Sequence, residues 1–344
     1  MPRTKRVDPS GPGISRSRSG KGFAYHEADG RLVTDREVKQ RIGALAIPPA
    51  WQDVWISPVR NGHIQATGFD ADKRKQYRYH EDWTSNQGRA KFDEMLEFGR
   101  ALPAMREQLD ADLRRRKLGR ERILACAVRL IDLGFFRVGS DRYTADHETY
   151  GLSTLQKRHV TVRSAALEFD FKAKGGQRYE REIADPTVHT TVKRLKQRPG
   201  PEKDELLAYR HDGDGEWIDV KAADINSYLK QSTGGDYSAK DFRTWNGTVL
   251  AAIQLSGKID AATSRGARKR LKNEATKEVA RYLGNTPAVA RSAYIDPRVF
   301  DRFDSGETIK GPLDYLDRQT DDEDFIDRDR IEKAVLRLIG DSSA

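Results

Sequence analysis

One tyrosine near the end of the sequence and a spaced set of polar and basic residues are the side chains whose types could do chemistry together. Tyr294 lies 51 residues after Arg243 and nine residues after Asn285, and Arg137 and Lys174 precede them. A phosphodiester is an anion whose transition state gathers charge on the non-bridging oxygens, where preorganised cationic donors supply most of the catalysis. The set therefore fits an attack on a phosphodiester.

Each residue type suits one part of such a reaction. A phenol, with an ordinary pKa near ~10, attacks phosphorus and can leave again, which conserves the bond energy and needs no ATP. An arginine stays charged and gives two directed hydrogen bonds. A lysine near the phosphate can protonate a departing 5′-oxygen if its pKa is suitable, and an asparagine amide can donate to a phosphate oxygen.

Both arginines lie in or directly after a regular element that can hold them rigidly. Arg137 directly follows an apolar helix expected over 120–133, and Arg243 lies within an amphipathic helix expected over 239–254. Lys240 lies three residues before Arg243, on the same face of that helix. A lone arginine is more often a surface residue, so these positions gain weight only from their context.

The other two polar candidates lie at turns. Lys174 stands in Ala-Lys-Gly-Gly between two expected strands, which predicts a flexible hairpin tip that can reach into a DNA groove. Asn285 follows Gly284, a signal for the end of a helix, so helix capping remains its alternative role.

Several familiar chemistries find no support in the sequence. There is no GxxxxGK[ST] phosphate loop, no HExxH and no CxxC, and the seven histidines show no metal-ligand spacing. The acidic runs Asp321–Asp324 and Asp327–Asp329 are typical of solvated surface. Cys126 is the sole cysteine, which fits a reducing compartment, and no apolar run is long enough to span a membrane.

The segments that carry these residues closely resemble the type IB DNA topoisomerases, specifically the small bacterial branch related to the poxvirus enzymes. They occur in the family's order, with its signature Lys-Asp-Phe-Arg-Thr: Phe135–Gly139, Phe169–Gly176, Ala239–Thr244, Leu283–Thr286 and Ser292–Ile295. Segments Ile47–Trp51, Gly68–Asp70 and Gln76–Tyr79 resemble the family's N-terminal domain. The resemblance runs from about Phe23 to Phe303.

This resemblance implies a role for each candidate. Tyr294 would attack the scissile phosphate and form a 3′-phosphotyrosyl bond. Arg137, Arg243 and Asn285 would stabilise the transition state, and Lys174 would protonate the departing 5′-oxygen. Many relatives carry histidine where this chain has Asn285, so acid catalysis is expected to rest mainly on Lys174. No metal, nucleotide or other cofactor is implied.

Lys240 resembles a second lysine that the family places near the scissile phosphate. A tyrosine recombinase is the alternative enzyme, but those enzymes usually have histidine three residues before the second arginine, where Lys240 stands. A basic DNA-binding protein without catalysis is the other alternative, and it would have no use for Tyr294.

Charge and length predict the organisation of the chain. The 344 residues suit two domains, and the net charge of +9 suggests a polyanionic partner. We expect an α+β fold with four parts: a disordered basic arm over 1–22, a small sheet-containing domain over 23–80, a larger mainly helical catalytic domain over 81–304, and an acidic tail with a short helix over 305–344. The two domains would clamp a DNA duplex.

Hydrophobic periodicity predicts the elements of these domains. Strands are expected at Phe23–Tyr25, Arg31–Val33, Val54–Ser57, Ile64–Gly68 and Gln76–Tyr79, and three more within 158–183. Helices are expected at 34–45, 90–116, 120–133, 186–196, 221–230, 239–254, 261–283 and 331–339.

Further basic and aromatic residues could grip DNA without taking part in chemistry. These are Arg74, Tyr77 and Tyr79 in the smaller domain and Arg268, Lys269 and Lys272 in the larger one. Strand packing and a solvated helix face are their respective alternatives. Double-stranded DNA is therefore the expected partner of a monomeric, cytoplasmic, nucleoid-associated protein.

Overall fold

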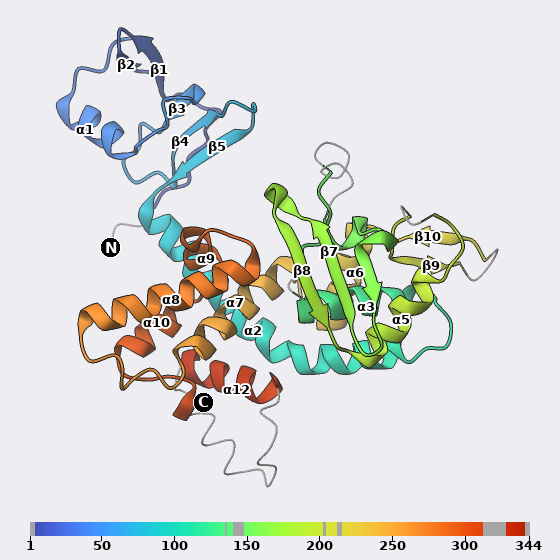
Figure 1. Ribbon diagram of the computed structural model, residues 1–344. Helices are drawn as coiled ribbons and strands as arrows, with labels where there is room; N and C mark the ends of the chain where they lie inside the picture. Colours follow the sequence, from blue (N-terminus) through green and yellow to red (C-terminus); the bar gives the residue numbers. More distant parts are fainter. Residues whose placement is uncertain are drawn as a thin grey trace. The chain divides into compact units, whose positions relative to one another are not determined.

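The computed structural model describes residues 4–134, 136–139, 148–201, 204–211, 215–311 and 328–340, without the side chains of 84–89. The chain divides into two compact units, Met1–Asp93 and Glu94–Ala344 (Figure 1). The long helix α2 (Glu81–Leu113) begins at the expected domain boundary, but its first residues belong to the first unit.

The first unit is a five-stranded antiparallel sheet with one helix. Its strands lie in the order β2-β1-β3-β4-β5. Their bounds are β1 (Ile14–Ser19), β2 (Gly22–His26), β3 (Gln52–Ile56), β4 (Ile64–Phe69) and β5 (Lys75–Tyr79), and the helix is α1 (Arg36–Ala44). The core unites Ile42 of α1 with Ile14, Val54, Ile56 and Ala66 of the sheet. The Asp35 carboxylate caps α1 by accepting two backbone N–H groups.

Strand β1 corrects the prediction of a disordered arm over residues 1–22. It pairs with both β2 and β3, and Ile14 is buried. The side chain of Arg16 donates to carbonyl oxygens of Pro48 and Trp51, which ties this polar strand down. Composition alone missed the strand because its stability comes from the sheet ladder. The expected strand Arg31–Val33 was also wrong, since only a single bridge forms there.

The second unit is mainly helical and carries a three-stranded sheet. Its helices are the remainder of α2 with α3 (Arg120–Gly134), α5 (Pro186–Lys196), α6 (Ala222–Thr233), α7 (Ala239–Leu255), α8 (Arg265–Leu283), α9 (Pro287–Ala293), α10 (Pro297–Asp304) and α12 (Arg328–Ile339). Strands β6 (Val160–Val162), β7 (Leu167–Lys172) and β8 (Arg178–Ile183) form the sheet, and β9 (Ala208–Arg210) and β10 (Trp217–Asp219) form a hairpin. The overall prediction of an α+β fold, with a small sheet domain and a larger helical one, is confirmed.

Helix α3 is the central helix of the second unit. Almost every residue from Arg122 to Ile131 is buried, and the helix contacts α5, α6, α7 and β8. Just after it, Phe136 is fully buried and its ring lies 5.0 Å from that of Phe169 on β7. The end of α3 is thereby anchored to the sheet.

The last described helix is part of the folded second unit, whereas the sequence predicted an acidic tail with a short helix. Helix α12 packs against α7 and α10 as part of the second unit. Residues 312–327, which include Asp321–Asp324, lie outside the described residues. Among those described, no helix is long and apolar enough to cross a membrane, and no cluster of His, Cys, Asp or Glu could hold a metal ion.

Candidate active site

One open groove in the second unit is lined by all six residues that the sequence predicts to be catalytic. They are Arg137 after α3, Lys174 at the β7–β8 tip, Lys240 and Arg243 on α7, Asn285 after α8, and Tyr294 at the end of α9. Five separate segments of the chain therefore converge on the groove. Figure 1 shows α7, α8 and α9 next to one another on one side of this unit.

Arg137 is held by the end of α8. Its Nη2 donates to the carbonyl oxygen of Gly284 at 3.0 Å and to Oδ1 of Asn285 at 2.9 Å. Burial lowers the pKa of this guanidinium from its ordinary value, but an arginine remains charged in a protein. The last carbonyl oxygens of a helix carry partial negative charge, so this position suits a cation.

The backbone that carries Arg137 is held by a close contact with the segment around Gly151. Gly139 has φ +92°, and a Cβ on Gly151 would lie 2.3 Å from the Cα of Gly139. The N–H of Leu152 donates to the carbonyl oxygen of Arg137 at 2.8 Å. Two glycines are needed because no side chain fits between the crossing segments.

Arg243 shares the same helix end. It is only 5% exposed, and its Nη2 donates to the carbonyl oxygen of Leu283 at 2.6 Å. Burial, reinforced by the charge of Arg137, lowers the pKa of Arg243. Its guanidinium carbon lies 5.2 Å from the centre of the Tyr294 ring. The C-terminus of α8 therefore holds two guanidiniums in the groove that Tyr294 also lines, and that of Arg243 lies beside the tyrosine ring.

Tyr294 is positioned through its backbone by α7. A Cβ on Gly247 would lie 2.5 Å from the carbonyl oxygen of Tyr294, so only glycine permits this approach. Two residues later, the N–H of Asp296 donates to Oγ1 of Thr248 at 3.0 Å, and the Tyr294 N–H donates to Ala290 at 3.0 Å. The same helix that carries Arg243 thus seats the tyrosine.

Asn285 lines the groove and has one amide donor without a hydrogen-bond partner among the described residues. Its Oδ1 accepts from Arg137, whereas its buried Nδ2 has no hydrogen-bond partner among the described residues. The alternative of helix capping is not what this side chain does, because the cap of α8 is Gly284, with φ +59°. A buried unpaired N–H is costly and is suited to a ligand oxygen.

Both lysines lie at exposed positions on the rim of the groove. Lys174 begins the tight turn Lys174–Gly176, in which Gly175 and Gly176 have φ values of +77° and +74°. Lys240 lies in the first turn of α7. The hairpin tip at Lys174 agrees with the sequence prediction.

Of the predicted DNA contacts in the first unit, the two tyrosines form an exposed pair. Tyr77 and Tyr79 are 41% and 47% exposed, and their rings stack with centroids 5.9 Å apart. Nearby, Arg74 pairs with the carboxylates of Asp70 and Asp72. The exposure of the two tyrosines does not fit the alternative given above, in which they only pack within the strand.

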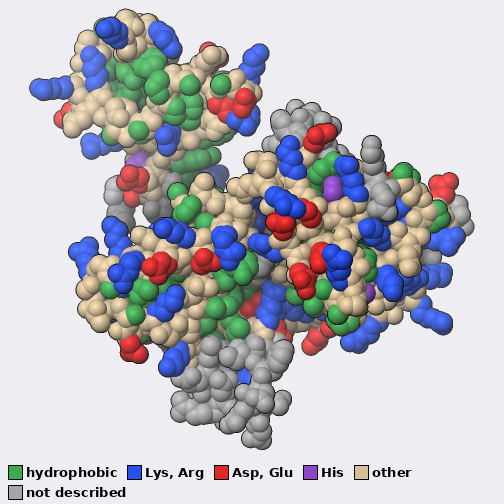
Figure 2. Space-filling model, in the orientation of Figure 1, with side chains coloured by type: hydrophobic (Ala, Val, Ile, Leu, Met, Phe, Trp, Pro, Cys, Tyr) green, Lys and Arg blue, Asp and Glu red, His purple; other side chains and the backbone are tan. Residues whose placement is uncertain are grey.

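The predicted contacts on α8 converge in a second groove. Arg268, Lys269 and Lys272 line it together with Arg265 and Arg291. Asp304 contributes a carbonyl oxygen to Arg268 and a carboxylate, at 2.5 Å, to Lys272. Figure 2 shows that Lys and Arg side chains are spread over much of the visible surface of each unit.

Sequence reasoning missed a smaller pocket that adjoins the groove. It is lined by Arg137, Lys174 and Arg243 and also by Arg181 and Tyr282. The guanidinium of Arg181 lies 5.3 Å from the ring centre of Tyr282, whose carbonyl oxygen accepts from it at 3.0 Å. The sequence offered little sign of a role for Arg181, because an arginine on a strand with alternating polar and apolar residues is usually solvated.

Comparison with known proteins agrees with this geometry. A family model described as "Eukaryotic DNA topoisomerase I, catalytic core" matches residues 74–310, and one described as "Bacterial DNA topoisomerase IB, N-terminal domain" matches residues 22–70. The DNA topoisomerase 1B of Acanthamoeba polyphaga mimivirus is 30% identical over 286 residues, which cover 82% of this chain and 85% of that protein.

More distant similarity extends to eukaryotic proteins. DNA topoisomerase 1 of Mycosarcoma maydis is 23% identical over 222 residues and that of Daucus carota is 28% identical over 182 residues. The matches cover 59% and 51% of this chain but 22% of either relative. The chain thus matches most of the viral protein and about a fifth of each of these eukaryotic ones.

Proposed function

This chain belongs to the type IB DNA topoisomerases, and we propose that it relaxes supercoiled duplex DNA by cutting and resealing one strand through a covalent bond to Tyr294. The observation that carries this assignment of residues is the groove in which all six candidates meet. The guanidinium of Arg243 lies there beside the ring of the tyrosine, and Arg137 lines the same groove, as a reaction at an anionic phosphodiester requires.

Cleavage exchanges one bond for another at phosphorus. The phenolic oxygen of Tyr294 forms a bond to the scissile phosphorus, and the bond from phosphorus to the 5′-oxygen breaks. Lys174, from its hairpin tip, gives a proton to that departing oxygen, and the phenolic proton passes to solvent. The product is a 3′-phosphotyrosyl link and a free 5′-hydroxyl.

Three donors stabilise the charge that builds up on the phosphoryl oxygens. Arg137 and Arg243 are already oriented by the carbonyl oxygens of α8, so little reorganisation accompanies the reaction. Asn285 donates through its unpaired Nδ2. Lys240, on the rim, adds a contact to a phosphate oxygen near the cleavage point.

Religation is the reverse of cleavage. The 5′-hydroxyl attacks phosphorus and the phenolate of Tyr294 leaves, with the charge of Arg243 beside its ring. Between the two steps the free end swivels, driven by the stress stored in the supercoil. The number and kind of bonds are unchanged over the cycle, so neither a nucleotide nor a metal ion enters the proposed scheme.

DNA contact extends beyond the groove in the proposed complex. Tyr77 and Tyr79 offer exposed rings, and Lys269 with its neighbours on α8 offers phosphate contacts. We assign the active form to a monomer that acts on the DNA of the nucleoid, because one chain supplies every residue of the scheme. Relaxation that rises linearly with protein concentration, and sedimentation as a monomer, are the expected results.

A plasmid assay tests the proposal. Wild-type protein is incubated with supercoiled plasmid in EDTA without ATP, and the reaction is stopped with detergent. We expect relaxed topoisomers and a DNA–protein adduct; Tyr294→Phe should give neither, and Tyr209→Phe, on β9 away from the groove, should behave as wild type. Adducts that survive Tyr294→Phe would contradict the assignment of the nucleophile. Relaxation that EDTA abolishes would contradict the metal-free scheme.

A further inference from the structure

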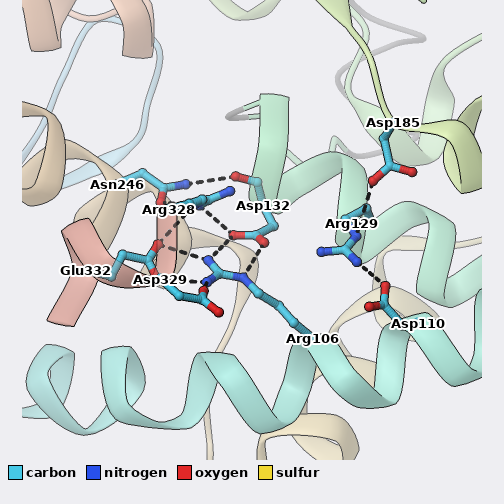
Figure 3. A network of polar contacts seen from close by, with 9 residues as sticks. All are labelled: Arg106, Asp110, Arg129, Asp132, Asp185, Asn246, Arg328, Asp329 and Glu332. Carbon is cyan, nitrogen blue, oxygen red and sulfur yellow. Dashed lines mark hydrogen bonds and ion pairs between the residues drawn. The ribbon is translucent and has the colours of Figure 1, made fainter. Parts of the chain in front are cut away.

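A charged network links the C-terminal helix α12 to three other helices, among them α3, which precedes Arg137, and α7, which carries Arg243 (Figure 3). Helix α12 contributes Arg328, Asp329 and Glu332, and their partners are Arg106 of α2, Asp132 of α3 and Asn246 of α7. Much of it is out of solvent: the side chains of Asp132 and Glu332 are 0% and 4% exposed. The network belongs entirely to the second unit.

Arg328 joins α3 and α7 at one point. Its Nη2 donates to Oδ1 of Asp132 at 2.7 Å and to Oδ1 of Asn246 at 3.0 Å. The Nδ2 of Asn246 donates in turn to the main-chain oxygen of Asp132 at 3.2 Å. One guanidinium therefore closes a ring of three residues, which we call the Arg328 ring.

Arg106 supports this ring from α2. It donates to both carboxylate oxygens of Asp132, at 2.9 and 3.2 Å, and to both of Glu332, at 2.8 and 2.9 Å. Burial alone would raise the pKa of Asp132, but the charges of Arg328 and Arg106 hold that pKa below its ordinary value. Asp132 is thus kept ionised with both oxygens engaged.

The Arg328 ring lies close in sequence to both catalytic candidates. Asp132 precedes Arg137 by five residues, and Asn246 follows Arg243 by three. Close-packed interiors transmit displacement, so a shift of α3 against α7 at the ring changes the spacing of the two guanidiniums. A misplacement of even 1 Å at a reacting centre slows an enzyme strongly.

Docking of α12 does not by itself require these charges. The helix also buries Ala334, Val335 and Leu338, which supply an apolar contact. A buried ion network often adds little stability over apolar residues of the same volume, whereas its directed bonds specify one arrangement. The distinctive contribution of the ring is therefore geometric.

We propose that Arg328 is a positioning residue: through the Arg328 ring, helix α12 sets the spacing of Arg137 and Arg243. This rests on the proposed function, because the spacing matters only for charge that strand cleavage places on the scissile phosphate. It assigns α12 a part in catalysis although none of its residues lines the groove.

The test uses two substrates and a matched control. Arg328→Met is compared with Lys333→Met, which removes the same charge from an exposed position of the same helix. Single-turnover cleavage is measured on duplexes with an ordinary phosphate or a neutral methylphosphonate at the scissile position. The neutral group gathers less negative charge, so misplaced arginines slow its cleavage less.

We expect Arg328→Met to slow cleavage at the phosphate about 10-fold and at the methylphosphonate no more than about 2-fold. Lys333→Met should match wild type on both. Arg328→Lys keeps the charge but lacks the fork, and it should fall between them. Equal slowing of Arg328→Met on the two substrates, or a similar loss in Lys333→Met, overturns the proposal.

Amide hydrogen exchange without DNA gives a second, independent measurement. The N–H groups of Leu152 and Ser153 donate to the carbonyl oxygens of Arg137 and Val138 and report on that segment. We expect faster exchange of these amides in Arg328→Met than in Lys333→Met under conditions where both variants are folded. Unchanged protection overturns the positioning role. A wild-type chain that forms no adduct on DNA overturns the proposed function instead, and the exchange result still decides whether α12 acts on the Arg137 segment.

Discussion

The groove has two sides that are built in opposite ways. On one side, Arg243 is buried and Arg137 is half-buried, and each donates to a carbonyl oxygen at the end of α8. On the other side, Lys174 stands exposed at a hairpin tip, followed by two glycines with positive φ. The arginines are thus fixed against the end of a helix, whereas the lysine projects from an exposed turn.

This difference matches what each group must do in the proposed reaction. Charge stabilisation works best with donors that are in place before the reaction starts. A proton donor must reach a leaving oxygen on the DNA and so benefits from a segment that can follow the duplex. The comparison predicts that variants on the arginine side impair the chemistry on any leaving group, and variants at the tip only when a proton is needed.

The largest effect should come from the arginine side. Arg137→Ala is expected to slow cleavage about 10²–10³-fold, because one preorganised donor to the charged transition state is lost. The dissociation constant for DNA should change far less. Single-turnover cleavage and fluorescence anisotropy give the two numbers, with the exposed Arg194→Ala as the control. Equal losses in binding and cleavage would make Arg137 merely a DNA contact.

Lys174→Ala should give a loss of about 10²-fold on ordinary DNA. A duplex with sulfur at the 5′-bridging position should restore most of that rate, since a thiolate leaves without a proton. The same duplex should not restore Arg137→Ala. If sulfur rescues both variants or neither, the division of labour between the two sides is wrong.

Asn285 should show a smaller effect, on the order of 10-fold for Asn285→Ala. The reason is its unpaired Nδ2, which we assign to a phosphoryl oxygen. Asn285→His keeps a donor and should lose less, while Asn285→Asp supplies no donor and adds a repelling charge, so it should lose more. Cleavage rates that follow side-chain volume in place of donor capacity would refute this role.

The smallest effect concerns the sheet that carries the tip. Burial lowers the pKa of His159 to about 4 from its ordinary 6.5, and its Nδ1 accepts the N–H of Gln156 at 3.1 Å. As the pH falls, His159 therefore becomes protonated near pH 6.5 in the unfolded chain but only near pH 4 in the folded chain. The stability from the neutral ring is complete above pH 6.5 and is lost as the pH falls toward 4.

Since His159 is only half-buried, this loss should be on the order of 1 kcal/mol. Thermal midpoints of wild type and of His159→Phe, compared between pH 7 and pH 4.5, measure it, because the other titrating groups are common to both proteins. Midpoints that fall in parallel would show that His159 does not contribute.

Local sequence signals predicted much of the fold and the identity of the groove residues. The 3.6-residue periodicity of α3 and α7 predicted both helices, and the residues predicted from the resemblance, among them Arg137, Lys174 and Tyr294, line one groove. By contrast, β1 has a polar sequence that pairs with its hairpin neighbour β2 and with the more distant β3, and α9 and α10 are short helices that start at prolines. Such elements depend on contacts that periodicity does not encode.

The geometry of the groove could not be predicted from the sequence either, because it also depends on contacts between distant parts of the chain. The two guanidiniums are set by backbone carbonyl groups of Leu283 and Gly284, and a main-chain oxygen has no signature of its own in a sequence. Glu332 lies 226 residues from its partner Arg106. The sequence around a basic residue in a helix is the same whether its side chain faces solvent or pairs with a carboxylate from a distant part of the chain.

Helix α12 is also the last of the described helices to be made. A ribosome adds about 5–20 residues per second, so Arg137, Lys174 and Tyr294 all exist in a nascent chain before Arg328 does. Under the proposed positioning role, such a chain has its nucleophile but not yet the spacing of its arginines. Cleavage at the full rate then begins only when α12 docks, so a nascent chain that lacks Arg328 would cut DNA more slowly than the finished one.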